Sequence, residues 1–193
     1  MKIQYFGHSC FKVEENNYSI VLDPYHNVNG FDDINLKANM VICSHNHGDH
    51  NYIEGVEIIS RDDCPFKVGT ISSYHDNELG KKRGLNNITI LNCGNKKIVH
   101  LGDQGCDLQD DDIAKIKGCD ALMIPVGGYY TISVHEAIKL IEKINPKNII
   151  PMHYKDGNKG LDVLEDIETI LEYLSKYKDK LLLVKGYEKT IEI

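Results

Sequence analysis

The sequence lacks the features that would place it in a membrane or on a secretory route. No apolar run approaches the roughly 18 residues that a membrane-spanning helix requires. The N-terminal segment Met-Lys-Ile-Gln-Tyr-Phe-Gly-His has no apolar core of the kind found in signal peptides. None of the six cysteines forms a C-x-x-C pair, which excludes zinc-ribbon and thioredoxin signatures. Because most of them lie in apolar runs, we expect reduced, buried thiols and a cytoplasmic protein.

The sequence also has fewer basic than acidic residues. The 193 residues include 22 Lys and Arg against 29 Asp and Glu, so the formal net charge is −7. A protein that binds the phosphate backbone needs a basic face, and we therefore expect no nucleic-acid partner. With 41% hydrophobic and 26% charged residues, the chain resembles a globular protein and not a disordered one. No repeat or low-complexity linker divides it, which predicts one domain over residues 1–193.

The order of apolar segments predicts strands first and helices later. Strands are expected at 2–6, 10–14, 18–23, 40–44, 56–60, 66–72, 87–92, 96–101, 121–126, 148–152, 181–184 and 188–193, with a polar loop before residue 38. Helices are predicted at 110–117, after the capping-box sequence Ser133-Val-His-Glu136, and at 162–177. The strands alternate too poorly with helices for a doubly wound sheet. Two packed sheets with helices outside, an α+β architecture, fit better.

Residues 44–51 form the most informative segment, directly after a predicted buried strand. Four side chains that can bind a metal lie within six residues there: His45, His47, Asp49 and His50. In an extended segment, His45 and His47 point to the same side because they are two residues apart. Imidazole and carboxylate groups suit zinc and similar divalent ions. A polar loop with incidental histidines explains one or two of these residues but not the cluster.

Three further candidate ligands stand at the carboxyl ends of other apolar runs, namely His75, Asp103 and His153. Taken singly, an Asp after a strand is often a turn residue, and a lone His is more often structural. Together with the cluster they provide seven ligands, which is enough for two metal ions. His100 is a rival to His75, although its position inside a predicted strand favours a role in the core or beside the ligands.

This series of residues resembles the ligands of the metallo-β-lactamase fold superfamily, in order and across nearly the whole chain. Shorter pieces resemble the branch that contains ascorbate-6-phosphate lactonases and the N-acylphosphatidylethanolamine phospholipase D type: Gly7-His8-Ser9, Asp23-Pro24, His100-Leu101-Gly102-Asp103, Pro125-Val126-Gly127-Gly128 and Pro151-Met152-His153-Tyr154. The resemblance implies an αββα four-layer sandwich of two mixed β-sheets with outer helices, and a site at one sheet edge.

The resemblance also implies how the ligands are shared. One metal ion is expected at His45, His47 and His75, a second at Asp49, His50 and His153, and Asp103 is expected to bridge them. Two divalent ions, zinc before manganese or iron, would lower the pKa of a shared water towards about 7. The resulting hydroxide would cleave a small ester, lactone or phosphodiester, with Asp49 as a catalytic residue. An iron-dependent oxidoreductase and a non-catalytic metal-binding protein are the alternatives.

The surroundings of the ligands suggest an anionic small-molecule substrate. Two divalent ions would leave the site locally positive despite the acidic chain. The basic segment 81–83 follows His75, and a mobile loop that grips a phosphate or carboxylate with Arg83 and Lys82 is one interpretation; a solvated basic turn is the other. Tyr130 is a candidate for the pocket wall. His8 and His100 are candidates for contacts to the ligands.

Overall fold

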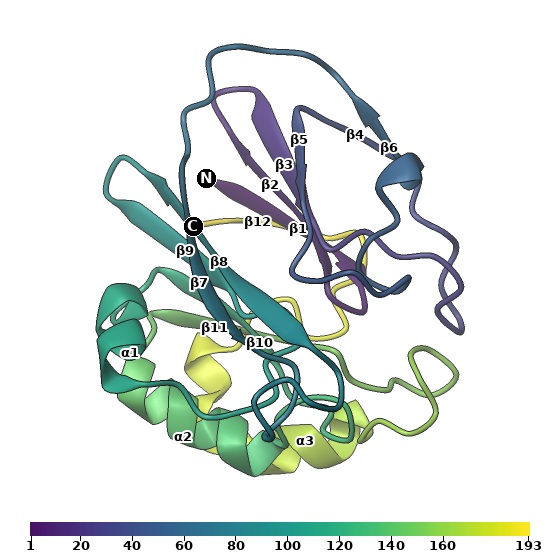
Figure 1. The fold of residues 1–193 in the computed structure, drawn as a ribbon, viewed down its shortest axis with the longest axis vertical. Coiled ribbons are helices and arrows are strands. Elements are labelled where there is room, and N and C mark those ends of the chain that lie inside the picture. The colour runs from purple at the N-terminus through teal and green to yellow at the C-terminus, as the bar shows by residue number, and fades with distance from the viewer.

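The computed structural model describes residues 1–193 and contains two mixed β-sheets packed face to face (Figure 1). The first sheet has the strand order β12-β1-β2-β3-β5, in which β3 and β5 are parallel and the other neighbours antiparallel. Its strands are β1 (Lys2–Gly7), β2 (Cys10–Glu15), β3 (Tyr18–Leu22), β5 (Met40–Ile42) and β12 (Thr190–Glu192).

The second sheet has the order β11-β10-β9-β8-β7, with parallel pairing among the first three strands and antiparallel pairing among the last three. Its strands are β7 (Lys67–Tyr74), β8 (Leu85–Cys93), β9 (Lys96–His100), β10 (Ala121–Pro125) and β11 (Asn148–Met152). Cys93 pairs with Lys96 across a short hairpin turn between β8 and β9, and Gly94 supplies the positive φ of 57° that such a turn requires.

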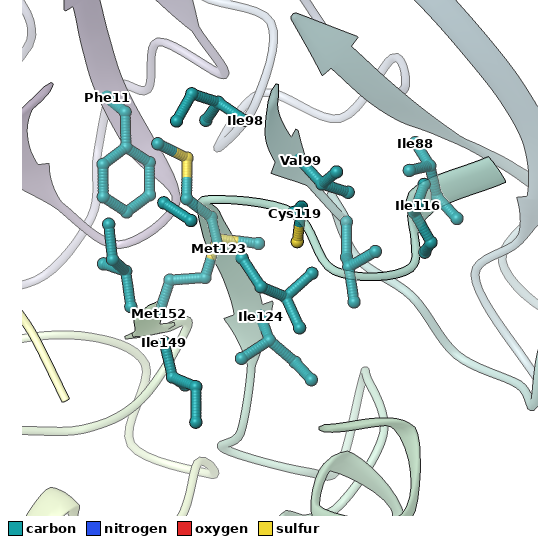
Figure 2. Packing of buried hydrophobic residues seen from close by; sticks show 14 of the residues in the cluster. Phe11, Ile88, Ile98, Val99, Ile116, Cys119, Met123, Ile124, Ile149 and Met152 are labelled. Atoms are coloured by element: carbon teal, nitrogen blue, oxygen red, sulfur yellow. The ribbon is translucent and has the colours of Figure 1, made fainter. Parts of the chain in front are cut away.

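A core of 38 buried hydrophobic residues fills the space between the sheets and extends beneath the helices. Figure 2 shows Phe11 of the first sheet close to Ile98, Met123 and Met152 of the second. Side chains of β3 alternate between two faces, so Ile20 joins this core while its neighbour Val21 joins a separate cluster. The first sheet is therefore covered on both faces.

The helices cover the outer face of the second sheet (Figure 1) and are α1 (Asp110–Ile116), α2 (Val134–Ile144) and α3 (Ile167–Tyr173). The predicted capping box is confirmed: the Ser133 hydroxyl accepts from the backbone N–H of Glu136, whose carboxylate accepts from the N–H of Ser133. Helix α2 ends at Asn145, which adopts a left-handed conformation. Its apolar face, which includes Leu140 and Ile144, is buried.

The outer side of the first sheet differs from the expected helical layer. The separate cluster of buried residues there is covered by the 3₁₀ turn η1 (Ile53–Gly55) and by a two-stranded parallel sheet of β4 (Leu36–Ala38) and β6 (Val56–Ile58). The α+β class with two mixed sheets and outer helices is confirmed, although all three α-helices follow β9 in the chain.

Two predicted elements near the C-terminus are wrong in extent. The helix predicted at 162–177 begins only at Ile167, because the Glu165 backbone is hydrogen-bonded to Lys155 and Gly127, and it gives way to the 3₁₀ helix η2 (Ser175–Lys180). Residues 181–184 form no strand beyond one bridge at Leu181, since the chain turns through a positive φ of 54° at Leu183. Strand β4 lies within the predicted polar loop.

Candidate metal centre

The seven predicted ligands lie together at the edge where β5, β7, β9 and β11 end. The segment after β5 carries the four clustered residues, and His75, Asp103 and His153 follow the other strands. Asp103 lies at the centre: its Oδ2 atom is 3.1 Å from His75 Nε2, 3.2 Å from His50 Nε2 and 3.3 Å from His153 Nε2. Residues from both sheets are thus brought within a few ångströms.

The side chains form two groups on either side of Asp103. Potential ligand atoms of His45, His47 and His75 all lie within 4.8 Å of one another. The same holds for a second group that consists of His8, Asp49, His50 and His153. The two groups contain the two ligand sets that the resemblance implies, with His8 as an addition to the second, and a third group of His45, His50 and Asp103 overlaps both.

A buried carboxylate that was not among the predicted site residues orients two of these histidines. Asp23 Oδ2 accepts hydrogen bonds from His50 Nδ1 at 2.8 Å and from the Ser44 hydroxyl at 2.6 Å. The same hydroxyl accepts from His45 Nδ1 at 2.8 Å. These contacts place a proton on Nδ1 of both rings and turn Nε2 inward, where its lone pair can bind a metal ion once any proton on that atom has left. The signal in the sequence was Asp23-Pro24 at the end of an apolar run.

Backbone groups fix the rings of His75 and His100. His75 Nδ1 donates to the carbonyl of Tyr130 at 3.1 Å, which leaves its Nε2 free to face Asp103. His100 Nε2 donates to the carbonyl of Ser9 at 2.9 Å, and its Nδ1 accepts from the N–H of Gly102 at 3.1 Å. Because both nitrogens of His100 have partners, this side chain has no atom left for a metal and joins the first sheet to the second.

Several polar atoms that face the centre are buried without a hydrogen-bond partner. They are His45 Nε2, His50 Nε2, His153 Nε2 and Asp103 Oδ1. These atoms lie close to one another, but their contacts do not have hydrogen-bond geometry. Each buried polar group left without a partner costs about 1–3 kcal/mol of folding free energy. Four such atoms converging from three chain segments, the one after β5 and those after β9 and β11, fit divalent cations, which take nitrogen and oxygen donors of this kind.

The protonation states also suit metal binding. Burial, reinforced by the neighbouring His50, lowers the pKa of His45 to about 3, so its imidazole is neutral at pH 7. Burial lowers the pKa of His8 to about 4 in the same way. Burial alone would lower the pKa of His50, but the carboxylates of Asp103 and Asp23 raise it well above its usual value. A metal ion at His50 must therefore displace a proton.

His8 occupies the turn between β1 and β2 with a φ of 50°. Its Nε2 donates to Asp49 Oδ2 at 3.2 Å, as the prediction of a contact to the ligands anticipated. The backbone N–H of His153 donates to the His8 carbonyl at 2.9 Å. The turn therefore supports candidate ligands from two other segments of the chain.

A cavity of about 270 Å³ opens onto the centre, and its lining residues are His47, Asp49, His75, Arg83, Asp103, Tyr130, His153 and Leu161. Two of the predicted substrate-binding residues, Arg83 and Tyr130, are thus brought to the site, and the Arg83 guanidinium lies 5.1 Å from the centroid of the Tyr130 ring. Lys82 is not among the lining residues; its ammonium group is paired with Glu78 on the surface.

None of the helices combines the length and the apolar character needed to cross a membrane.

Comparison with known proteins gives a consistent result. A family model described as a Beta-lactamase superfamily domain matches residues 2–153. A UPF0173 metal-dependent hydrolase from Desulforamulus reducens is 29% identical over 192 residues, covering 80% of this chain and 84% of that protein. A UPF0173 protein from Pyrococcus furiosus is 31% identical over 180 residues, covering 80% and 83%.

Among solved structures, a proposed Zn-dependent hydrolase of the metallo-β-lactamase superfamily from Thermotoga maritima is 29% identical, with a TM-score of 0.69 over 89% of this chain and 84% of that one. The family model, the relatives and the shared fold agree with the ligand pattern described above. The chain belongs to the metallo-β-lactamase superfamily.

Proposed function

We propose that the protein is a metal-dependent hydrolase that holds two divalent ions and cleaves a small ester, lactone or phosphodiester. The observation that carries this proposal is the convergence of unpartnered buried donors on Asp103. Hydrolase activity is also the property named for the Desulforamulus reducens relative. The finer resemblance to lactonases and phospholipase D enzymes remains a prediction.

In this proposal the two groups of side chains hold one ion each. His45, His47 and His75 would bind the first ion, and Asp49, His50 and His153 the second, with Asp103 between them. Zinc is preferred because histidine-rich nitrogen and oxygen sites suit it, and manganese or iron(II) can occupy the same donors. When bound, such ions supply Lewis acidity and lower the pKa of a water so that it can act as a nucleophile near neutral pH.

Proton transfer, the other requirement of hydrolysis, is assigned to a residue of the cavity wall. Asp49 lines the cavity, and its carboxylate is held in place by a hydrogen bond from the Nε2–H group of His8. We assign it the handling of a proton at Oδ2, either from the attacking water or to the leaving group. An Asp49→Asn variant should lose turnover even with zinc supplied in excess so that both sites are filled; full turnover with full metal content would exclude this role.

The function is tested with the protein loaded with zinc, manganese or iron(II) and with the chelated protein as reference. The substrates are p-nitrophenyl acetate, γ-butyrolactone and bis(p-nitrophenyl) phosphate. Turnover should depend on metal and disappear in His47→Ala and Asp103→Ala. His135→Ala, an exposed histidine on α2, is the matched control and should retain activity. Metal-loaded protein that is inert towards all three substrates would contradict the proposal.

The same preparations separate hydrolysis from redox chemistry. An iron-dependent oxidoreductase would consume oxygen in the iron-loaded form and would be inactive with zinc. A hydrolase should turn over its substrate without oxygen uptake. Oxygen consumption that requires His47 would therefore replace the hydrolase proposal with the redox alternative.

A further inference from the structure

The basic segment 81–83, which follows His75 in the chain, belongs to a loop that surrounds one buried carboxylate. Asp76 is 3% exposed, and its two oxygens accept four backbone hydrogen bonds. Oδ1 accepts from the N–H groups of Glu78 at 2.8 Å and Gly80 at 3.0 Å. Oδ2 accepts from those of Lys82 at 3.0 Å and Arg83 at 2.8 Å. The segment is therefore a closed loop built on Asp76, in contrast to the mobile loop considered from the sequence.

The two ends of the loop are also joined to each other. The backbone N–H of His75 donates to the Gly84 carbonyl at 3.1 Å, and the N–H of Gly84 donates to Gly80 at 2.9 Å. Gly80 and Gly84 have φ values of 78° and 87°, which other residues rarely adopt. A Cβ at position 80 would lie 2.9 Å from the Gly84 carbonyl oxygen. The loop thus delivers Arg83 to a fixed place directly beside the metal ligand His75.

The guanidinium of Arg83 has hydrogen-bonding capacity that the protein does not use. It makes no hydrogen bond and no ion pair, whereas Arg61, the other arginine, pairs with Asp63 and donates to the Asn17 carbonyl. Its one recorded partner is the face of the Tyr130 ring at 5.1 Å. Tyr130 itself is tied to the site because its carbonyl accepts from His75. Arg83 is half-buried and lines the cavity with its donors free.

We propose that Arg83 is a preformed clamp for an oxyanion of the substrate and that Asp76 is the residue that positions it. This rests on the proposed hydrolase function and deepens it: the substrate is a small molecule with a carboxylate or phosphate group separate from the bond that is cleaved. A guanidinium binds such groups through two parallel hydrogen bonds, and the tyrosine ring below keeps its plane oriented. A cavity of about 270 Å³ limits the substrate to a compact molecule.

The first test compares two esters of equal chain length, neutral p-nitrophenyl valerate and mono-p-nitrophenyl glutarate, which carries a carboxylate. The wild-type protein should prefer the glutarate ester in kcat/KM. Arg83→Gln should reduce that preference by about 10–100-fold, mainly through KM, because a charged hydrogen-bonding pair is lost. Arg83→Lys should recover only part of it. An unchanged preference in Arg83→Gln would overturn the proposal.

Lys81→Gln is the matched control, since it removes the same charge from the same loop. Lys81 is exposed, and it lies outside the cavity wall. The preference for the anionic ester should therefore be unchanged in this variant. An equal loss in Lys81→Gln and Arg83→Gln would mean that general electrostatic attraction, and not a clamp, selects the substrate, and would also overturn the proposal.

A binding measurement keeps the clamp testable if neither ester is hydrolysed. Calorimetric titration of the zinc-loaded protein with glutarate and with phenyl phosphate shows which oxyanion the site takes. Metal ions attract both probes, so the decisive quantity is the ratio of Kd values between Arg83→Gln and wild type at equal zinc content. A ratio of about 10 or more for either probe supports the clamp; a ratio near 1 for both refutes it, whatever the outcome for hydrolysis.

The role of Asp76 has its own readout. An asparagine presents an NH₂ group to two of the four backbone N–H groups, so Asp76→Asn should loosen the loop enough for trypsin to cleave after Lys81, Lys82 or Arg83. It should lose the same preference for the glutarate ester as Arg83→Gln, and the double variant should lose no more. Gly84→Ala, whose Cβ meets no atom within 4 Å but which strains the backbone, is a second way to loosen the loop. Trypsin cleavage with an unchanged preference would exclude positioning.

Discussion

Replacing Asp23 by asparagine tests whether zinc binding at the proposed metal centre depends on a residue that is not itself a candidate ligand. Asp23 is 1% exposed and accepts three hydrogen bonds: Ser44 N–H at 2.7 Å, the Ser44 hydroxyl at 2.6 Å and His50 Nδ1 at 2.8 Å. Asparagine keeps one acceptor and turns an NH₂ group towards the other donors. Where the NH₂ group faces His50, the ring relieves the conflict by giving up its Nδ1 proton and keeping one on Nε2, the atom that faces Asp103.

The size of the effect follows from that change of tautomer. Loss of a partner that orients a ligand typically weakens metal binding by about 10–100-fold, which is roughly 1.4–2.7 kcal/mol. The loss of hydrogen bonds to a charged acceptor should also lower the free energy of unfolding, by about 1.5–3 kcal/mol. Binding and folding are therefore both expected to weaken in Asp23→Asn.

The assay is competition for zinc between the protein and a chromophoric chelator, with urea unfolding in parallel. Asp120→Asn is the matched control, because Asp120 is also buried and accepts from the Lys97 N–H and the Lys147 ammonium, both at 2.8 Å. It should lower stability and leave zinc affinity unchanged. Unchanged zinc affinity in Asp23→Asn would refute the argument that Asp23 sets the tautomer of His50.

Three further outcomes are expected. Zinc binding should release a proton from His50, whose pKa is raised, so affinity should fall as pH falls; calorimetry in buffers of different ionisation enthalpy measures this, and zero release would count against it. His100→Ala should cost about 1–3 kcal/mol of stability by leaving the Ser9 carbonyl unpartnered and should keep both metal ions, whereas His75→Ala should lose zinc; elemental analysis and urea unfolding decide between them. Leu122→Ala in the core should cost about 2–5 kcal/mol in urea unfolding with no change in zinc content.

The candidate ligands could be found from the sequence because each follows an apolar run. In a sandwich of sheets, several strand ends meet at one edge, and the residues after β5, β7, β9 and β11 do so here. The choice between His75 and His100 could not be made in this way. It depends on which ring nitrogens find backbone partners, and those partners, Tyr130 and Ser9, are 55 and 91 residues away.

The roles of Asp23 and Asp76 could not be predicted from the sequence, for two different reasons. Asp23 acts on Ser44 and His50, 21 and 27 residues later in the chain. Asp76 has only local partners, but these are backbone N–H groups. Because almost every residue type has such a group, the sequence gives no sign that four of them point at one carboxylate. In the sequence, a carboxylate near a basic segment is typical of a solvated turn, and only the structure shows that the loop folds around it.

The C-terminal half shows a related limit on helix prediction. The apolar spacing at 162–177 indicates most of the buried side chains: Leu164, Ile167, Ile170 and Leu174 lie in the interior, and Leu171 is partly buried against it. Burial does not require a helix at every one of these positions. The Glu165 backbone pairs instead with Gly127 and Lys155, and so the chain enters the core in an extended form before α3 begins.

Anomalous diffraction from crystals of the zinc-loaded protein, recorded at the zinc absorption edge, tests the central claim most directly. The account predicts two peaks, one within bonding distance of the Nε2 atoms of His45 and His75, the other within bonding distance of His50 and His153, with Asp103 in contact with both. A single peak outside these residues, or no peak in protein that binds zinc in solution, would contradict it.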